Sequence, residues 1–156
     1  MRFLIPFILI FQFCSAQKTY QKNYSDTGLL SSEGWIDQNR KTDYWTYYHP
    51  NGNVESAGHY THGKKSKYWR FYRTNGTIES EGHFINGKKH KWWLFYDDNE
   101  KVNHKCQLQN DIKNGYCLMY EDEELVSAIK YSEGKKVKKW TNFRDFKREN
   151  NLRDLQ

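Results

Sequence analysis

Four side chains that could bind a metal ion or transfer protons form two pairs with the same sequence separation. His59 and His83 are 24 residues apart, and Glu55 and Glu79 have the same separation. Imidazole nitrogens are common zinc ligands, and paired carboxylates can act as general acid and base. A fifth candidate is a cysteine pair, Cys106–Cys117, which could form a disulfide or remain as two free thiols. The elements that carry these residues decide which chemistry is possible.

The interval of 24 residues runs through most of the chain, and such self-similarity is the signature of a repeat protein. Four columns of residues keep this register, except that the last interval is 23 before Trp140, Phe143 and Gly134: Trp45, Trp69, Trp93, Cys117 and Trp140; Tyr48, Tyr72, Tyr96, Tyr120 and Phe143; Gly34, Gly58, Gly82 and Cys106; Gly63, Gly87, Asp111 and Gly134. The agreement of four columns indicates about five repeats.

Each repeat has the pattern of a β-hairpin. The third one contains the segments IESEGHF, INGKKHK, WWLFY and DDNEK. Alternating runs with β-branched and aromatic residues are typical of strands, and Asn-Gly pairs favour tight hairpin turns. Neighbouring strands are about 4.8 Å apart, so each hairpin advances the array by about 10 Å. We therefore predict an all-β fold, an elongated antiparallel β-solenoid of about five hairpins with a short C-terminal capping helix.

The best two repeats resemble the MORN repeat in its bacterial variant form. They read EGHYTHGKKSKYWRFYRTNGTIES and EGHFINGKKHKWWLFYDDNEKVNH, with Glu-Gly, a turn glycine before Lys-Lys, and a tryptophan among aromatic residues. The fourth repeat departs from the pattern at Cys106 and Cys117, and the fifth lacks the glycine before its first strand. The resemblance implies the hairpin fold and a scaffolding or lipid-contacting role. Some bacterial proteins with this repeat are labelled antitoxins, a role that an exported chain does not favour.

The ends of the chain predict export and capping. Residues 1–16, MRFLIPFILIFQFCSA, have the basic start, short apolar run and final alanine of a signal peptide. The apolar run is shorter than the roughly 20 residues that span a bilayer. Lipidation at Cys14 and an uncleaved anchor are the alternatives. Residues 17–29 are predicted to be a flexible polar leader, residues 30–146 the repeat domain, and residues 147–156 a tail or cap. The chain would then be periplasmic, at the cell surface or secreted.

The glycine and tryptophan columns are 11 residues apart, so they should face each other across each hairpin. The pairs are Gly34 with Trp45, Gly58 with Trp69, and Gly82 with Trp93. A missing side chain leaves room for the ring, and aromatic cover of a strand glycine is a known device. Cys106 and Cys117 have the same spacing. Directly opposed Cβ atoms lie about 4.5–5.5 Å apart, which predicts a disulfide, with buried free thiols as the alternative.

Two surfaces are candidates for binding. A basic edge at the turns within the hairpins would consist of Lys64, Lys65, Lys67, Lys88, Lys89, Lys91, Lys135 and Lys136. These charges could bind an anionic surface, or they could only be solvated and keep sheet edges from pairing. An aromatic strip on the face opposite the tryptophan column would consist of Tyr44, Tyr68, Trp92 and Tyr116. It is either a stacking ladder or an exposed strip for a glycan, peptide or lipid.

The repeat also limits the chemistry of the recurring histidines and glutamates. Side chains one repeat apart are separated by about 10 Å, whereas zinc ligands lie about 2.0–2.1 Å from the ion. We therefore expect no metal site, cofactor or catalytic centre. The predicted function is a non-enzymatic, exported protein-binding or scaffolding module that acts through the basic edge and the aromatic strip. The alternative is a peripheral module that binds anionic lipid, and nucleic acid is not an expected partner of an exported protein.

Overall fold

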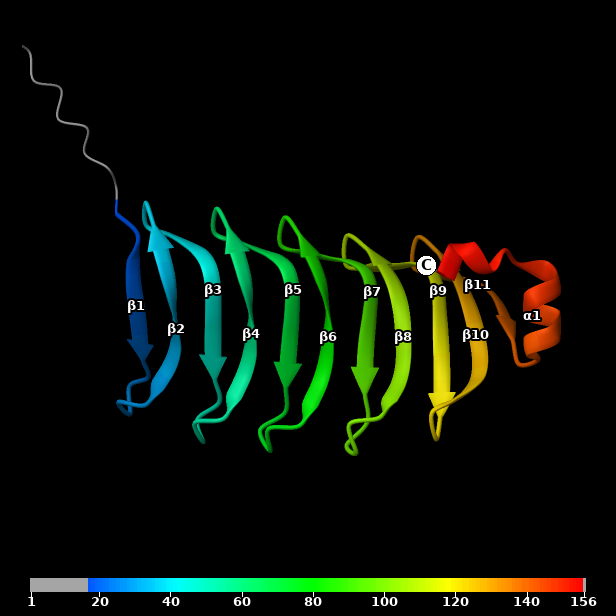
Figure 1. The fold of residues 1–156 in the computed structure, drawn as a ribbon, viewed down its shortest axis with the longest axis horizontal. Coiled ribbons are helices and arrows are strands. Elements are labelled where there is room, and N and C mark those ends of the chain that lie inside the picture. Colours follow the sequence, from blue (N-terminus) through cyan, green and yellow to red (C-terminus); the bar gives the residue numbers. More distant parts are fainter. Residues whose placement is uncertain (1–16, 156) are drawn as a thin grey trace, which may run out of the picture.

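The computed structural model describes residues 17–155 as one open antiparallel sheet followed by a short helix (Figure 1). Eleven strands lie side by side in chain order: β1 (Thr19–Tyr24), β2 (Leu30–Asp37), β3 (Arg40–Tyr48), β4 (Val54–Thr61), β5 (Lys64–Tyr72), β6 (Ile78–Ile85), β7 (Lys88–Tyr96), β8 (Val102–Gln109), β9 (Ile112–Glu121), β10 (Glu124–Ser132) and β11 (Lys135–Trp140). Helix α1 (Phe143–Glu149) and a 3₁₀ turn (Leu152–Leu155) follow. The prediction of an all-β chain with hairpins and a short C-terminal helix is confirmed, while the predicted signal peptide, residues 1–16, lies outside the described residues.

The turns within the hairpins explain the repeated turn glycine. Asn86 and Gly87 have φ values of 53° and 85°, the left-handed conformation that both central residues of a type I′ turn require. The Gly87 amide also donates a hydrogen bond to the carbonyl of Lys65 in the preceding hairpin, at 2.9 Å. These turns therefore join neighbouring hairpins along one edge of the sheet, and the turns between hairpins lie along the other edge (Figure 1).

Glycine and tryptophan alternate in one row across the middle of the sheet. Trp69 pairs with Gly58 on one side and with Gly82 on the other. A Cβ atom on Gly58 would lie 2.4 Å from the Trp69 indole, so the ring lies directly over the glycine. The three rings of Trp45, Trp69 and Trp93 are 0% exposed. The predicted facing of glycine and tryptophan is confirmed, and the sheet face that carries these three rings is called the tryptophan face.

A two-residue bulge recurs in the second strand of the early hairpins. Gly58 pairs with Trp69, but the next residue, His59, pairs with Ser66, which leaves Lys67 and Tyr68 as extra residues in β5. Lys67 adopts a left-handed φ of 58°. A bulge of this kind bends the strand and redirects side chains. The same irregularity occurs in β3, β7 and β9, so it belongs to the 24-residue repeat.

The expectation that Trp140 continues the tryptophan column is wrong. In the last hairpin Ile129 pairs with Lys139 and Tyr131 with Lys136, so β11 contains one extra residue instead of two. A shift by one residue moves every later side chain to the other face of a strand. Trp140 therefore lies on the face opposite the tryptophan face, called here the helix face, where its ring centroid is 5.4 Å from that of Phe146 in α1.

Both predicted ends of the repeat domain need correction. Residues 19–24 form strand β1 and not a flexible leader, and Gln21 pairs with Gly34 at the position where later hairpins carry tryptophan. The polar residues of β1 end the row of rings, as a capping strand of a repeat array should. At the other end, α1 begins at Phe143, before the predicted boundary at residue 146. Asn142 caps this helix by accepting a hydrogen bond from the Arg144 amide at 2.8 Å.

Candidate binding surfaces

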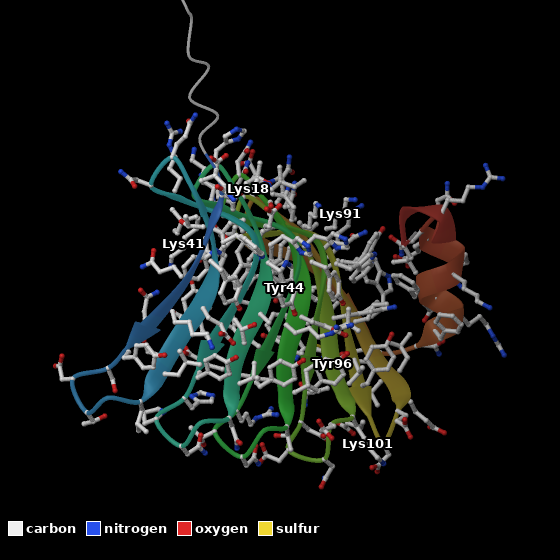
Figure 2. All side chains as sticks on the ribbon, turned by 60° about the vertical axis from the view of Figure 1, so that its left-hand side comes forward. Lys18, Lys41, Tyr44, Lys91, Tyr96 and Lys101 are labelled. Carbon is white, nitrogen blue, oxygen red and sulfur yellow. A yellow bond between two sulfur atoms is a disulfide. The ribbon has the colours of Figure 1, made fainter. Side chains whose placement is uncertain are left out.

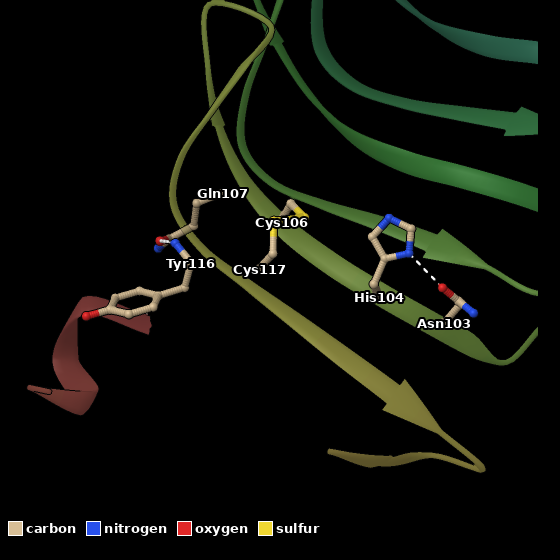
Figure 3. The surroundings of a disulfide bond; sticks show 6 residues. All are labelled: Asn103, His104, Cys106, Gln107, Tyr116 and Cys117. Carbon is tan, nitrogen blue, oxygen red and sulfur yellow. Dashed lines mark hydrogen bonds between the residues drawn. A yellow bond between two sulfur atoms is a disulfide. The ribbon is translucent and has the colours of Figure 1, made fainter. Parts of the chain in front are cut away.

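The disulfide takes the place of a glycine–tryptophan pair in the fourth hairpin. Cys106 and Cys117 are directly paired on β8 and β9, with Cα atoms 4.0 Å apart, and they are bonded to each other (Figure 3). Their exposures are 0% and 1%, so water has almost no access to the sulfur atoms. The predicted disulfide is confirmed, and it continues the buried row beyond Trp93.

The lysines of the predicted basic edge fall into two groups, and the first is turned inward. The Lys65 ammonium lies 4.2 Å from the centroid of Trp69 and 4.8 Å from that of Phe71, and Lys89 lies 4.1 Å from Trp93. Burial lowers the pKa of both lysines, because the charged form loses hydration. Long lysine stems can cover apolar surface in this way. Lys65 and Lys89 therefore complete the hydrophobic core and are not part of the exposed edge.

We expect the stem of Lys65 to matter more for stability than its charge. Lys65→Ser should lower the free energy of unfolding by about 1–2 kcal/mol, because it uncovers the Trp69 ring. Lys65→Met should retain most of that stability, and Lys64→Ser should change it little. Urea unfolding of the three variants measures these differences. An equal loss in the serine and methionine variants of Lys65 would show that the charge is the stabilising part.

The second group of lysines forms the exposed basic edge. It consists of Lys64, Lys67, Lys88, Lys91, Lys135 and Lys136, which are all exposed. Among the side chains that the structure describes, no carboxylate oxygen lies within 4.0 Å of these six ammonium groups. Lys91 lies toward one edge of the sheet and Lys101 toward the other (Figure 2). Asp111 interrupts the row and accepts a hydrogen bond from the Lys89 amide at 2.7 Å.

The aromatic strip is only partly available, because α1 covers its C-terminal end. Tyr44 is 49% exposed, whereas Tyr116 is 3% exposed. The Tyr116 ring meets Phe146 edge to face at 5.6 Å, and its hydroxyl donates to Asn150 at 2.8 Å. Tyr68 and Trp92, the other predicted members, are half-buried. The exposed strip therefore ends before Tyr116, and that residue is part of the packing beneath the helix.

The recurring histidines pair with tyrosines on the helix face. His59 meets Tyr44 edge to face at 5.2 Å, and His83 meets Tyr68 at 4.9 Å. Burial, followed by the charge of the nearby Lys67, lowers the pKa of His59; burial and then Lys91 do the same for His83. Within the part of the chain that the structure describes, no three His, Cys, Asp or Glu side chains are grouped to hold a metal ion. The geometry thus gives both histidines a packing role.

A scan against protein-family models finds no match, and a comparison with curated proteins finds no similar sequence. No helix within residues 17–155 is long and apolar enough to cross a membrane.

Proposed function

We propose that this chain is a non-catalytic, exported MORN-like β-solenoid of about five hairpins that binds an acidic protein partner and acts as a scaffold. The observation that supports this most is a row of six lysines on one edge of the sheet, none of which forms an ion pair with a described side chain. Each unpaired charge is hydrated in the free protein and can form an ion pair with a partner. The inward position of Lys65 and Lys89 sharpens the proposal, because it leaves only the outer lysines as contact residues.

The spacing of the lysines favours an extended partner. Lys64 and Lys88 lie in equivalent turns two strands apart, which corresponds to about 10 Å. This distance is close to the Debye length at physiological salt, so the fields of neighbouring clusters partly add. An acidic protein surface that meets several hairpins at once gains from each contact, although every single exposed ion pair is weak.

Two features support the proposed export. The disulfide is of a kind that persists in oxidising compartments, and residues 1–16 have the pattern of a signal peptide. An antitoxin-like role, which the resemblance alone suggests, would place the chain in the reducing cytosol and is therefore the weakest reading.

An anionic lipid surface is the second candidate, and one specific observation favours it. The basic turns lie along a single edge of the sheet, so their lysines could meet a flat membrane together (Figure 1). Lys/Arg residues near an anionic leaflet contribute about 1 kcal/mol each. The aromatic strip lies on a sheet face instead of this edge, and it would not enter the same membrane.

Replacing Lys64 and Lys88 by serine should weaken binding to an acidic partner and leave the fold intact. With polyglutamate as the probe, we expect an affinity about fivefold lower, from two lost exposed ion pairs. Fluorescence anisotropy at two salt concentrations measures the loss and its screening.

The matched control is Lys101→Ser, which is compared with Lys88→Ser. Each variant removes one positive charge, Lys88→Ser from the basic edge and Lys101→Ser from the opposite edge. An equal effect of the two variants would contradict a role for the basic edge. Vesicles of phosphatidylglycerol separate the two candidates. Vesicle binding without polyglutamate binding supports the lipid candidate over the protein partner.

A further inference from the structure

A row of aromatic rings, made of three contacting pairs and a final tryptophan, crosses the helix face of the first seven strands. It begins at β1, where Tyr20 pairs with Trp35 and meets it edge to face at 5.2 Å. The row then alternates tyrosine with histidine and ends in a tryptophan: Tyr20, Trp35, Tyr44, His59, Tyr68, His83 and Trp92. Tyr20 and Trp35 were not predicted as strip residues, because the first half-hairpin lacks the tryptophan that marks the repeat. From Tyr44 to Trp92 the row spans four strand spacings, about 19 Å.

Within the described residues, 17–155, helix α1 covers the C-terminal end of the same face. There Phe146 of α1 packs on Tyr116 and Trp140, which are 3% and 7% exposed. Tyr20, Trp35 and Tyr44 remain 50%, 40% and 49% exposed. The uncovered rings therefore continue a surface whose other end is already occupied by an aromatic contact.

Cationic groups flank this row at the same 24-residue interval. Lys67 is one of the two extra residues of the bulge in β5. It lines a hollow of about 360 Å³ with Tyr44, Tyr68 and Arg70, over the small side chain of Ala57. Lys91 takes the equivalent place beside His83 in the next hairpin, where it lines a second hollow with Trp92. Lys67 thus adjoins the exposed ring of Tyr44. Lys91 adjoins the half-buried Trp92, whose centroid also lies 5.1 Å from the Lys105 ammonium.

Two carboxylates on this face, those of Glu81 and Glu33, are already engaged. Glu81 accepts hydrogen bonds from the Tyr96 hydroxyl at 2.6 Å and from Arg70 at 3.0 Å. Glu33 accepts one from Tyr48 at 2.6 Å and lies 3.4 Å from the Lys22 ammonium. Since these negative charges are neutralised within the protein, the strip as a whole favours an anionic ligand.

We propose that this strip binds an acidic polysaccharide that lies across the strands. The apolar faces of sugar rings pack on aromatic side chains, and Lys67 and Lys91 would pair with carboxylates one period apart, about 10 Å. That period is close to the length of one disaccharide in an extended chain, so the ligand class is a glycan with one acidic group per disaccharide. This inference rests on the proposed role as a binding module and names the partner of its aromatic strip.

The ring geometry favours a sugar over a single-stranded nucleic acid. Bases bind such proteins by stacking on the faces of aromatic side chains. Here the rings already contact each other edge to face within three pairs, Tyr20–Trp35, Tyr44–His59 and Tyr68–His83. The centroids are 4.9 Å to 5.2 Å apart, so a base cannot insert within a pair. A ligand that meets more than one pair must lie over them, as a ribbon of sugar rings can.

Titration calorimetry with a hyaluronan decasaccharide tests the proposal, because this glycan carries one carboxylate per disaccharide. Lys67→Asn/Lys91→Asn removes both ammonium groups, and asparagine tolerates the left-handed φ values of 58° and 62° at these positions. We expect this variant, and separately Tyr44→Ala, to bind at least about tenfold more weakly, which is about 1.4 kcal/mol. Circular dichroism checks that each variant is folded.

The matched control is Lys64→Ser/Lys88→Ser, which removes the same charge from the same two hairpins at the turns. Its hyaluronan affinity should fall by less than that of the Lys67→Asn/Lys91→Asn variant, because Lys64 and Lys88 lie in the turns, away from the rings of the strip. Any one of four results would overturn the inference. Two concern the variants: an equal loss of hyaluronan affinity in both lysine double variants, or no loss of affinity in Tyr44→Ala. The other two concern the ligand: a neutral chitin hexasaccharide that binds as tightly as hyaluronan, or oligothymidine that binds more tightly. If the parent protein binds polyglutamate but not hyaluronan, the inference is overturned and the proposed function stands. If the parent protein binds neither probe, the proposed function is overturned as well.

Discussion

Gly58→Ala should lower the free energy of unfolding by about 3 kcal/mol, the upper end of what overpacking usually costs. The added Cβ would lie 2.4 Å from Cγ and Cδ2 of Trp69, which is far inside van der Waals contact. The Trp69 ring is 0% exposed and donates its indole N–H to the His59 carbonyl at 3.0 Å, so it has little freedom to move away. Urea unfolding followed by tryptophan fluorescence measures the loss.

Two controls separate this contact from other effects of losing a glycine. At Gly52, where φ is 86°, an added Cβ meets nothing within 4 Å, so Gly52→Ala reports only the backbone cost of a left-handed conformation, about 1–2 kcal/mol. The second control is Gly58→Ala/Trp69→Leu, in which a smaller side chain makes room for the methyl group. We expect the double variant to be more stable than the sum of the single losses. Simple additivity would contradict the steric explanation.

The hairpin register and the disulfide could be predicted from the sequence because both follow from spacing. Gly58 and Trp69 are 11 residues apart, and so are Cys106 and Cys117, so one alignment places both pairs opposite each other. The position of the hairpin turn could also be predicted from the sequence, since Asn86 and Gly87 are the residues that a tight hairpin turn prefers. These features are local, and each is set by a few neighbouring residues.

The wrong predictions have a different cause. The sheet face on which a side chain lies, and its exposure, depend on bulges and on segments that are distant in the sequence. The position of Trp140 depends on a bulge that is one residue shorter in β11, and a bulge has no distinctive residue type. Tyr116 is covered by Phe146, which is 30 residues away in the sequence. Strand β1 was missed because Gln21 stands in the tryptophan position, although Gly28 keeps the 24-residue register with Gly52.

The lysine columns show the same limit within a single turn. Lys64 and Lys65 are adjacent and identical in type, and alternation alone says that they point to opposite sides. Only the structure shows that the Lys65 stem reaches the Trp69 ring and that Lys64 remains exposed. A count of lysines in the sequence thus overestimates the number of exposed charges on the basic edge, because it includes the lysines that cover the core.

The disulfide and the glycine–tryptophan pair should be exchangeable, because they occupy the same register. Cys106→Ser/Cys117→Ser should lose about 2–3 kcal/mol, since the bridge closes a loop of about a dozen residues. Cys106→Gly/Cys117→Trp should recover most of this loss without any covalent bond. Cys117→Trp alone should be the least stable of the three, because the Cβ of Cys106 would collide with the new indole as an added Cβ on Gly82 would with Trp93. Urea unfolding of the three variants gives this order.

The order of the three variants separates two explanations of the fourth hairpin. If the bridge only replaces lost packing, the Gly–Trp variant approaches the parent and the single Cys117→Trp variant falls well below the serine variant. If the Gly–Trp variant is no more stable than the serine variant, the surroundings of β8 and β9 have adapted to the disulfide and no longer accept an indole. The neighbouring pairs favour the first explanation, because Cys106 already contacts Trp93 across β7 and β8 as Gly82 contacts Trp69. Under the first explanation, the buried row on the tryptophan face would tolerate either a small residue paired with a large one or a disulfide.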